Sequence, residues 1–309
     1  MMPSPLTVCI CTHNPRRDVF QLVLAALARQ TLAKNAFRVC VIDNGSLPAL
    51  ADNEMDTLAR AGVSYFIVRE ERLGNVHARE CAIRATQGAW VVFVDDDNEL
   101  AEDYLGCVLD IIQSNPQFGC FGGKLLLESP VPPPRWIMPL LNHVAIKDCG
   151  DEVLTNCVDY WGPWEPPTAG AAVKRPVLEL YLRNVAQSKG SSQLGRKGRT
   201  GLLSNEDSLM MHGAFELGLQ CSYQPRLVLK HHIDPSRFRF SYMVKLCYGF
   251  GRSQVLLARC LGKAVPRPTW LDVFKLCFKI PRSRKRICTL ATDWGRVIES
   301  RRTETLEYL

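Results

Sequence analysis

Short apolar runs alternate with amphipathic segments along the first 127 residues of the chain. The apolar runs are rich in Val, Ile, Phe and Cys and end in turn or polar residues, a pattern typical of strands. It predicts strands over residues 6–12, 37–45, 63–70 and 89–97. Between them, the longer segments with helical periodicity predict helices over residues 18–32, 49–62 and 74–88.

This alternation predicts an α/β fold. Strands separated by helices of ten to fifteen residues form right-handed crossovers, and these build a mostly parallel, Rossmann-like sheet with helices on both faces. Ligands of such sheets bind outside the carboxyl ends of the strands. Polar clusters follow three of the strands, at residues 11–14, 43–46 and 95–99. Each cluster could be an ordinary turn or helix cap, but together they indicate a site at one edge of the sheet.

Three consecutive carboxylates, Asp95, Asp96 and Asp97, follow the apolar run that begins at Trp90. Adjacent like charges repel, and capping a helix near Leu100 would explain only one of them. In extended geometry Asp95 and Asp97 would share a face and Asp96 would point elsewhere. The cluster therefore predicts a hard divalent cation, Mn²⁺ or Mg²⁺, and a phosphorylated ligand.

Composition is that of a globular protein. The chain has 309 residues, of which 47% are hydrophobic and 22% charged, enough for one large core or a core with a subsidiary lobe. It contains no long uninterrupted apolar run, and its first residues do not resemble a secretory signal, so we expect a cytoplasmic protein without a spanning helix. The 13 cysteines lie scattered in apolar stretches without Cys-x-x-Cys pairs, which favours buried reduced thiols over disulfides or zinc.

The net charge of +7 is concentrated near the C-terminus. Residues 263–286 contain eight Lys or Arg residues against a single acid, Asp272, and also carry Trp270 and Phe274. Such a stretch could lie on an anionic membrane at the cytoplasmic face, or it could be a helix with a solvated basic face. No recognised nucleic-acid motif accompanies the charge, so nucleic acid is not an expected partner. Residues 291–309 are predicted to form a charged terminal helix.

Five motifs in order resemble the family two glycosyltransferases of GT-A fold, which transfer a sugar from a nucleotide diphospho-sugar with inversion. They are "LTVCICTHN", "FRVCVIDNGS", "GNVHARE", "GAWVVFVDDD" and the stretch over residues 204–232 that begins "SNEDSL". The resemblance covers about residues 6–255. It implies a GT-A sheet with a smaller mixed acceptor-side region and a helical C-terminal extension.

The resemblance also implies roles on the donor side. The loop at the first strand would contact the nucleotide base, with His13 where an aromatic residue such as Tyr is usual. Asp43 would accept a hydrogen bond from the base, and Arg79 would lie near the phosphates or the acidic motif, unless it is simply a solvated helix position. The implied residues that bind the nucleotide sugar are Thr12, His13, Asn14, Asp43, Arg79, Asp95 and Asp96, and the implied metal ligands are Asp97 and Asp95.

For the chemistry, the resemblance implies that Asp207 is the general base and Glu206 its support. Both acids could instead cap the helix predicted over residues 207–218. His231 or His232 resembles a histidine that approaches the metal or the phosphates.

The acceptor loop is implied to lie within residues 156–181. There, Trp161 and Trp164 could stack on a sugar ring or anchor the loop in the core, and Gly170 would belong to its glycine-rich turn. Residues 188–201 lack periodicity and are predicted to form a mobile lid. Arg252 could reach a diphosphate, although a surface position is the simpler interpretation.

These inferences divide the chain into residues 1–127, which would bind the nucleotide sugar, 128–240, which would supply the acceptor side and the base, and a basic helical extension over 241–309. The predicted protein is an inverting, metal-dependent glycosyltransferase acting on a polysaccharide, glycolipid or other cell-envelope acceptor. Two alternatives stay open, namely a nucleotide-sugar-binding protein without turnover and a metal-dependent phosphatase.

Overall fold

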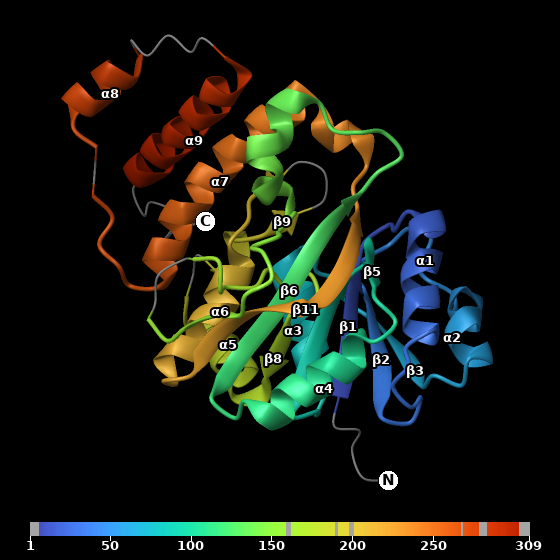
Figure 1. The fold of residues 1–309 in the computed structure, drawn as a ribbon. Coiled ribbons are helices and arrows are strands. Elements are labelled where there is room, and N and C mark those ends of the chain that lie inside the picture. The colour runs from blue at the N-terminus through green and yellow to red at the C-terminus, as the bar shows by residue number, and fades with distance from the viewer. Residues whose placement is uncertain are drawn as a thin grey trace.

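A single nine-stranded sheet runs through the centre of the protein (Figure 1). The structure is a computed structural model that describes residues 6–158, 162–188, 191–197, 201–266, 268–277 and 283–302. Its sheet has the strand order β3-β2-β1-β4-β8-β6-β11-β5, and β7 pairs with β11. The strands are β1 (Leu6–Thr12), β2 (Phe37–Asp43), β3 (Tyr65–Arg69), β4 (Trp90–Asp95), β5 (Asn98–Leu100), β6 (Phe118–Glu128), β7 (Leu154–Asn156), β8 (Ala172–Lys174) and β11 (Gln220–His232).

The register of the parallel strands brings the polar clusters together. β1 pairs in parallel with β2 and β4, and β2 pairs in parallel with β3. Thr12 lies opposite Asp43 on β2, and Cys11 lies opposite Asp95 on β4. The carboxyl ends of the three strands therefore lie side by side at one edge of the sheet. Strands from later in the chain make the sheet mixed, because β8 runs antiparallel to both β4 and β6.

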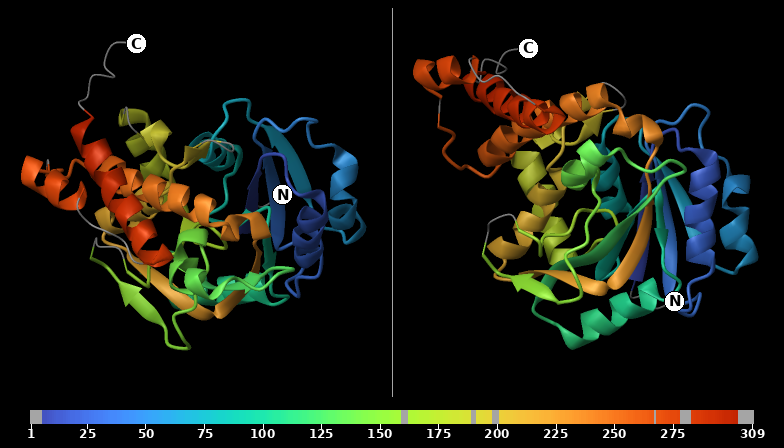
Figure 2. Two further views of the ribbon diagram at one scale, coloured as in Figure 1. Left: turned by 90° about the horizontal axis from the view of Figure 1, so that it is seen from above. Right: turned by 45° about the horizontal axis from the view of Figure 1, so that its top comes forward.

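Helices cover both faces of the sheet, as the α/β prediction requires (Figures 1 and 2). One face packs against α1 (Arg17–Ala28), α2 (Asp56–Arg60) and α4 (Tyr104–Ser114), which bury Phe20, Leu58 and Leu105 in one core. The other face packs against α3 (Asn75–Ala85), α5 (Arg175–Gln187) and α6 (Glu206–Glu216). Burying apolar side chains on both faces accounts for the continuous apolar runs of β1, β2 and β4.

The C-terminal helices form a third cluster on the side of the molecule away from α1 and α2 (Figure 2). This region consists of η2 (Arg135–Val144), η4 (Pro235–Phe238), α7 (Phe240–Cys260), α8 (Trp270–Cys277) and α9 (Arg284–Arg301). Its core includes Ile137, Met243, Leu246 and Cys288. Of the helices that the structure describes, none is long and apolar enough to cross a membrane.

Several local predictions need correction. The helix expected up to Gly88 ends at Ala85, because Thr86 is extended. Residues near Leu100 form β5, and the next helix begins only at Tyr104 after Asp103, so Asp97 and Asn98 cap no helix. The segment expected over 49–62 splits into η1 (Asp52–Met55) and α2, which ends at Arg60, and Gly62 follows it with a positive φ.

The segment predicted as an irregular lid contains ordered elements. Within residues 188–201, the structure describes η3 (Ser191–Gln193) and a small antiparallel ladder between β9 (Arg196–Lys197) and β10 (Gly201–Leu202). All 13 cysteines lie among the described residues and are free thiols, as predicted, but the prediction that they are buried holds for seven of them, and Cys157 and Cys277 are exposed. The division of the chain at residues 127 and 240 stays a prediction.

Candidate active site

A large cavity lies at the carboxyl ends of β1 and β4. Its volume of about 1010 Å³ suits a ligand of the size of a nucleotide sugar. Ten residues predicted from the sequence line it, namely Thr12, His13, Asn14, Arg79, Asp95, Asp96, Asp97, Glu206, Asp207 and His231. Sequence reasoning assigned no role to other polar lining residues, which include Asn44, Asn75, Lys147, Thr168, Arg196 and Arg237.

The three aspartates lie at a turn rather than along an extended strand. β4 ends at Asp95, and Asp96 and Asp97 form the turn that leads to β5. The prediction that Asp96 points away from its neighbours is therefore wrong, because the turn breaks the alternation of an extended chain. The Thr12 hydroxyl donates a hydrogen bond to Asp96, and all three carboxylates line the same cavity.

Asp95, Asp96 and Asp97 form an acidic turn, and their three charges are not compensated to the same extent. Burial raises the pKa of Asp95, and burial together with the neighbouring Asp97 raises the pKa of Asp96. Burial would also raise the pKa of Asp97, but His231 at 3.2 Å and Arg237 at 3.5 Å hold it below its usual value. The turn therefore carries more carboxylates than its protein partners neutralise.

The donor set of the acidic turn suits a hard cation, although the turn is not a complete cage. Among the residues described here, no group of three or more His, Cys, Asp or Glu side chains is arranged to hold a metal ion. Mg²⁺ and similar ions, however, are commonly held by one or two carboxylates together with substrate phosphates. The carboxylates of Asp95 and Asp97 fit that pattern, because both face the cavity and lie close to uncompensated negative charge.

The structure distinguishes the two candidate histidines. His231, at the end of β11, is buried, lines the cavity and contacts Asp97 through Nε2. Its Nδ1 is also buried and has no hydrogen-bond partner among the described residues. His232 instead lies 2.9 Å from Glu99 through Nε2. His231 is therefore the histidine of the acidic turn.

A buried ion pair connects α3 to the start of α6. The Arg79 guanidinium donates to the carboxylate of Glu206 and to the Thr168 hydroxyl. Asn75 donates a further hydrogen bond of 3.3 Å to Glu206. Burial alone would raise the pKa of Glu206, but Arg79 lowers it below its usual value. Arg79 lines the cavity as predicted, yet its guanidinium pairs with Glu206 rather than with the acidic turn.

Asp207 follows directly in the first turn of α6. The preceding Asn205 has a positive φ of 69°, which turns the chain sharply into the helix. Burial and the adjacent Glu206 raise the pKa of Asp207 to about 6, and Arg79 opposes this increase only in part. A cavity-facing carboxyl group with this pKa can accept a proton near neutral pH.

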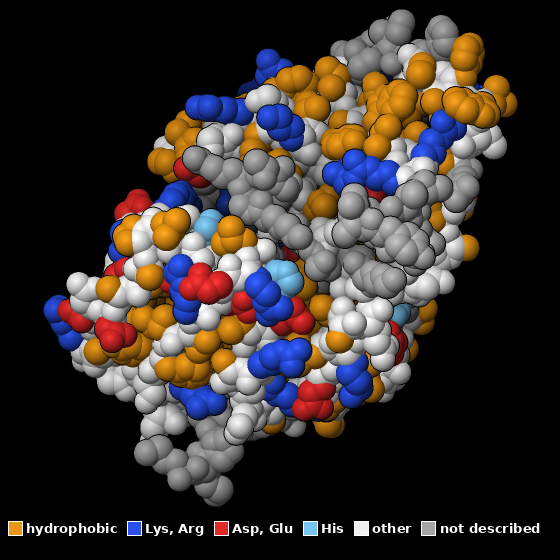
Figure 3. All heavy atoms as spheres, turned by 180° about the vertical axis from the view of Figure 1, so that it is seen from behind, with side chains coloured by type: hydrophobic (Ala, Val, Ile, Leu, Met, Phe, Trp, Pro, Cys, Tyr) orange, Lys and Arg blue, Asp and Glu red, His pale blue; other side chains and the backbone are white. Residues whose placement is uncertain are grey.

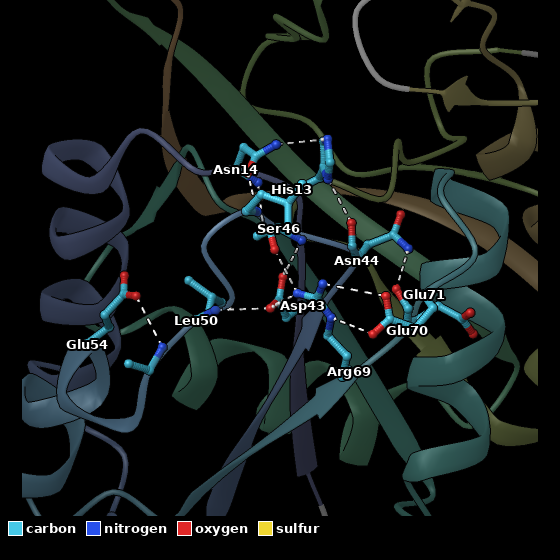
Figure 4. A network of polar contacts seen from close by, with 12 residues as sticks. His13, Asn14, Asp43, Asn44, Ser46, Leu50, Glu54, Arg69, Glu70 and Glu71 are labelled. Atoms are coloured by element: carbon cyan, nitrogen blue, oxygen red, sulfur yellow. Dashed lines mark hydrogen bonds and ion pairs between the residues drawn. The ribbon is translucent and has the colours of Figure 1, made fainter.

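The loop after β1 is held against the loop after β2 (Figure 4). His13 contacts the Asn44 carbonyl oxygen through Nδ1 at 2.7 Å. The Asn14 backbone N–H donates to the Ser46 hydroxyl at 2.8 Å, and the Asn14 side chain accepts from Leu47 N–H at the same distance. These bonds place Thr12, His13 and Asn14 at the mouth of the cavity as one unit.

Asp43 is not among the residues that line the cavity, and its role at the nucleotide base stays a prediction. Its carboxylate accepts hydrogen bonds from the backbone N–H groups of Ser46 and Leu50 and from Arg69 at 2.6 Å (Figure 4). Burial would raise the pKa of Asp43, but these donors lower it. Asp43 therefore shapes the turn, and the next residue, Asn44, lines the cavity. Both belong to the cluster seen in the sequence, which does not show which one faces the ligand.

The residues predicted for the acceptor side do not line the cavity where the structure describes them. Trp161 lies outside the described residues. Trp164 is half-buried and packs against the core on the α5 and α6 side of the sheet, and it does not line the cavity. Gly170 has a positive φ, and the Tyr104 hydroxyl donates to its carbonyl oxygen at 2.6 Å, so it shapes a buried turn. Arg252 pairs with Glu299 at 2.7 Å and does not reach the cavity.

A mixed α/β sheet of this topology, with an acidic turn at its carboxyl edge and two acids at the start of α6, is the arrangement of the GT-A fold. The family comparison agrees. Residues 7–149 match the model of glycosyl transferase family 2.

Solved structures share the fold. TarS residues 1–349 from S. aureus, in complex with UDP, aligns with a TM-score of 0.52 and 16% identity, over 83% of this chain and 70% of that chain. The mannosyltransferase PcManGT from Pyrobaculum calidifontis, in complex with GDP-Man and Mn²⁺, aligns with a TM-score of 0.53 and 18% identity, over 97% and 74% respectively. A comparison of the sequence with curated proteins found no match.

Proposed function

We propose that this glycosyltransferase moves a sugar from a nucleotide diphospho-sugar to an acceptor hydroxyl with inversion, with Asp207 as general base. One observation carries the proposal. Asp207, whose pKa is raised to about 6, lines the same cavity as the acidic turn of Asp95, Asp96 and Asp97. A base and a cation site in one cavity are what a single displacement of a diphosphate leaving group requires.

On the donor side, we assign the acidic turn to the diphosphate. Asp97 and Asp95 would hold a divalent cation, Mn²⁺ or Mg²⁺, which as a Lewis acid stabilises the charge of the leaving nucleotide diphosphate. PcManGT, which shares the fold, is bound to GDP-Man and Mn²⁺. Arg196 and Arg237 also line the cavity and would add positive charge near the diphosphate. His13 and Asn44 would contact the nucleotide base.

In the transfer step, Asp207 takes the proton of the acceptor hydroxyl while that oxygen attacks the anomeric carbon. The bond from the anomeric carbon to the diphosphate oxygen breaks at the same time, and the nucleotide diphosphate leaves with the electron pair. The Arg79–Glu206 pair positions Asp207, because it fixes the start of α6 next to this base. The cell-envelope acceptor and the cytoplasmic location stay predictions.

The substitution Asp207→Asn tests the base directly. The amide keeps the size of the side chain but cannot accept the proton, so sugar transfer should fall by at least about 10²-fold. Affinity for the nucleotide diphosphate should change by no more than about threefold, because Asp207 is not assigned to the donor. Transfer can be measured by release of the nucleotide diphosphate, and affinity by calorimetry. The exposed Asp110→Asn is a matched control that should leave both unchanged.

The other outcomes separate the competing functions. A large loss of nucleotide affinity in Asp207→Asn would contradict its assignment as base. Equal, near-zero rates of transfer and of donor hydrolysis in both proteins would favour a binding protein without turnover. Phosphate release from a phosphomonoester that is unaffected by Asp207→Asn would favour the metal-dependent phosphatase.

A further inference from the structure

Helix α8 presents apolar side chains to solvent. Trp270 is 80% exposed, and Leu271 and Phe274 are each 60% exposed. Of its eight residues, Leu276 is the one that is buried. Figure 3 shows hydrophobic side chains gathered at this end of the molecule, with Lys and Arg side chains beside them. Leaving three large apolar side chains in water on one short helix is unfavourable, which indicates a surface that contacts something else.

The helix is nevertheless held in place. Thr269 and Asp272 exchange hydrogen bonds at its start, with the Thr269 N–H donating at 2.9 Å and the Asp272 N–H donating at 3.2 Å. The guanidinium of Arg301, on α9, lies 4.4 Å from the centre of the Trp270 ring. The apolar face is therefore presented by a docked helix rather than by a frayed segment.

The surroundings of this face are positively charged. Exposed basic side chains lie on α8, at Lys275, and on the first turn of α9, at Lys285 and Arg286. The nearby acids are already engaged, because Asp272 caps α8 and Glu299 is buried against Arg252. Arg284 is also committed, since it lies over the rings of Trp136 and Phe240. The exposed charge of Lys275, Lys285 and Arg286 is thus basic and complementary to an anionic partner.

We propose that α8 and the first turn of α9 form a docking surface for an anionic lipid bilayer. Trp270, Leu271 and Phe274 would enter the interface between head groups and acyl chains, where tryptophan is favoured. Lys275, Lys285 and Arg286 would meet the lipid phosphates. A second copy of the chain is a poorer partner, because its own basic residues would face these ones. The proposal does not depend on the reaction that the cavity performs.

Docking would also orient the cavity. α9 packs along α7, and Phe250 on α7 lines the cavity. A protein bound through α8 would therefore hold its cavity on a rigid support at the lipid surface. If the proposed transfer is correct, this arrangement favours an acceptor presented at a membrane.

The test uses the full chain and two sets of vesicles, phosphatidylcholine alone and phosphatidylcholine mixed with phosphatidylglycerol, in a co-sedimentation assay. One variant combines Trp270→Ser, Leu271→Ser and Phe274→Ser. A second combines Lys275→Gln, Lys285→Gln and Arg286→Gln. The matched control removes exposed apolar side chains elsewhere, with Leu22→Ser, Val153→Ser and Leu217→Ser. Circular dichroism and thermal unfolding verify that every variant is folded.

The unaltered protein should bind the anionic vesicles at least about tenfold more tightly than the neutral ones, and less tightly at high salt. The apolar variant should lose binding by at least about tenfold, the charge variant should lose the preference for anionic lipid, and the control should bind normally. Absence of vesicle binding by the unaltered protein would overturn the proposal. So would unchanged binding by both α8 variants, or dimerisation through α8 in sedimentation without vesicle binding.

Discussion

At the scale of single residues, the surroundings shift the pKa values of two adjacent acids, Glu206 and Asp207, in opposite directions. Glu206 is buried and Asp207 is half-buried, and only Glu206 is paired with Arg79. The pair lowers the pKa of Glu206, whereas burial and the charge of Glu206 raise the pKa of Asp207 to about 6. Neighbouring titratable groups whose pKa values are pushed apart are typical of acid and base assignments in active sites.

This arrangement predicts the pH dependence of transfer. Asp207 acts as a base only when ionised, and its pKa is raised to about 6, so kcat/KM should fall as pH decreases through about 6. Glu206→Gln removes the negative charge that raises this pKa, so the acidic limb should move to lower pH. The measurement is kcat/KM across the acidic range for both proteins, with the exposed Glu102→Gln as control. A limb that stays in place in Glu206→Gln would exclude Asp207 as the titrating group.

At the scale of elements, the site depends on strand register and on helices that approach closely. The parallel register of β1 with β2 and β4 brings three polar loops to one edge. On the other side, α7 and α9 cross at glycines. A Cβ added to Gly251 would lie 2.0 Å from the Thr292 carbonyl oxygen, and one added to Gly295 would lie 2.1 Å from that of Tyr248. Backbone groups cannot give way as a side chain can, so these contacts set the spacing of the two helices.

Gly251→Ala should therefore destabilise the protein. Overpacking a close helix contact costs about 1–3 kcal/mol in the free energy of unfolding. Gly106 on α4 is the matched control, because a Cβ there meets nothing within 4 Å. Gly106→Ala should instead stabilise the protein by about 0.5–1 kcal/mol, since alanine is the better helix former. Urea unfolding of the two variants measures both values, and equal stability would mean that α7 and α9 do not pack this tightly in solution.

At the scale of the whole molecule, the cavity is assembled from almost the entire chain. Its lining extends from Cys11 on β1, through Arg79 on α3 and Asp207 on α6, to Phe250 on α7. A ligand in this cavity would contact the ends of the strands, helices α3 and α6 on one face of the sheet, and α7 in the C-terminal region. Binding should therefore stabilise the folded protein as one unit.

We expect a nucleotide diphosphate with Mn²⁺ or Mg²⁺ to raise the thermal unfolding midpoint. Binding to the native state at one hundred times the dissociation constant contributes about 2.7 kcal/mol. Chelator should remove the metal-dependent part of the shift. The Asp97→Ala variant should not show this part either, when its unfolding midpoint with ligand and metal is compared with its midpoint without them. The same variant should lose at least about 10²-fold in turnover. A panel of nucleotides would identify the preferred base, while an equal shift with metal and with chelator would contradict the cation site.

Much of the fold and part of the site can be predicted from the sequence. Periods of 2 and 3.6 residues in the apolar pattern identify strands and helices, because each element must bury one face or stripe. The same pattern places polar clusters at strand ends, and these include Asp95, Asp97 and His13. The sequence predicts the ends of helices and strands less accurately, as at Ala85 and Leu100, because local signals for caps and turns compete with tertiary pairing.

By itself, the sequence determined the α/β class and the polar edge of the sheet, since both follow from local periodicity, while the acids that begin α6 were singled out by the resemblance of their motif to the family. Only the tertiary structure decided that Asn44 rather than Asp43 lines the cavity and that His231 rather than His232 contacts Asp97. It alone joined Arg79 to Glu206, which is 127 residues away along the chain. Such choices depend on which side chains packing brings together, and residues distant in sequence leave no local pattern that records their contact.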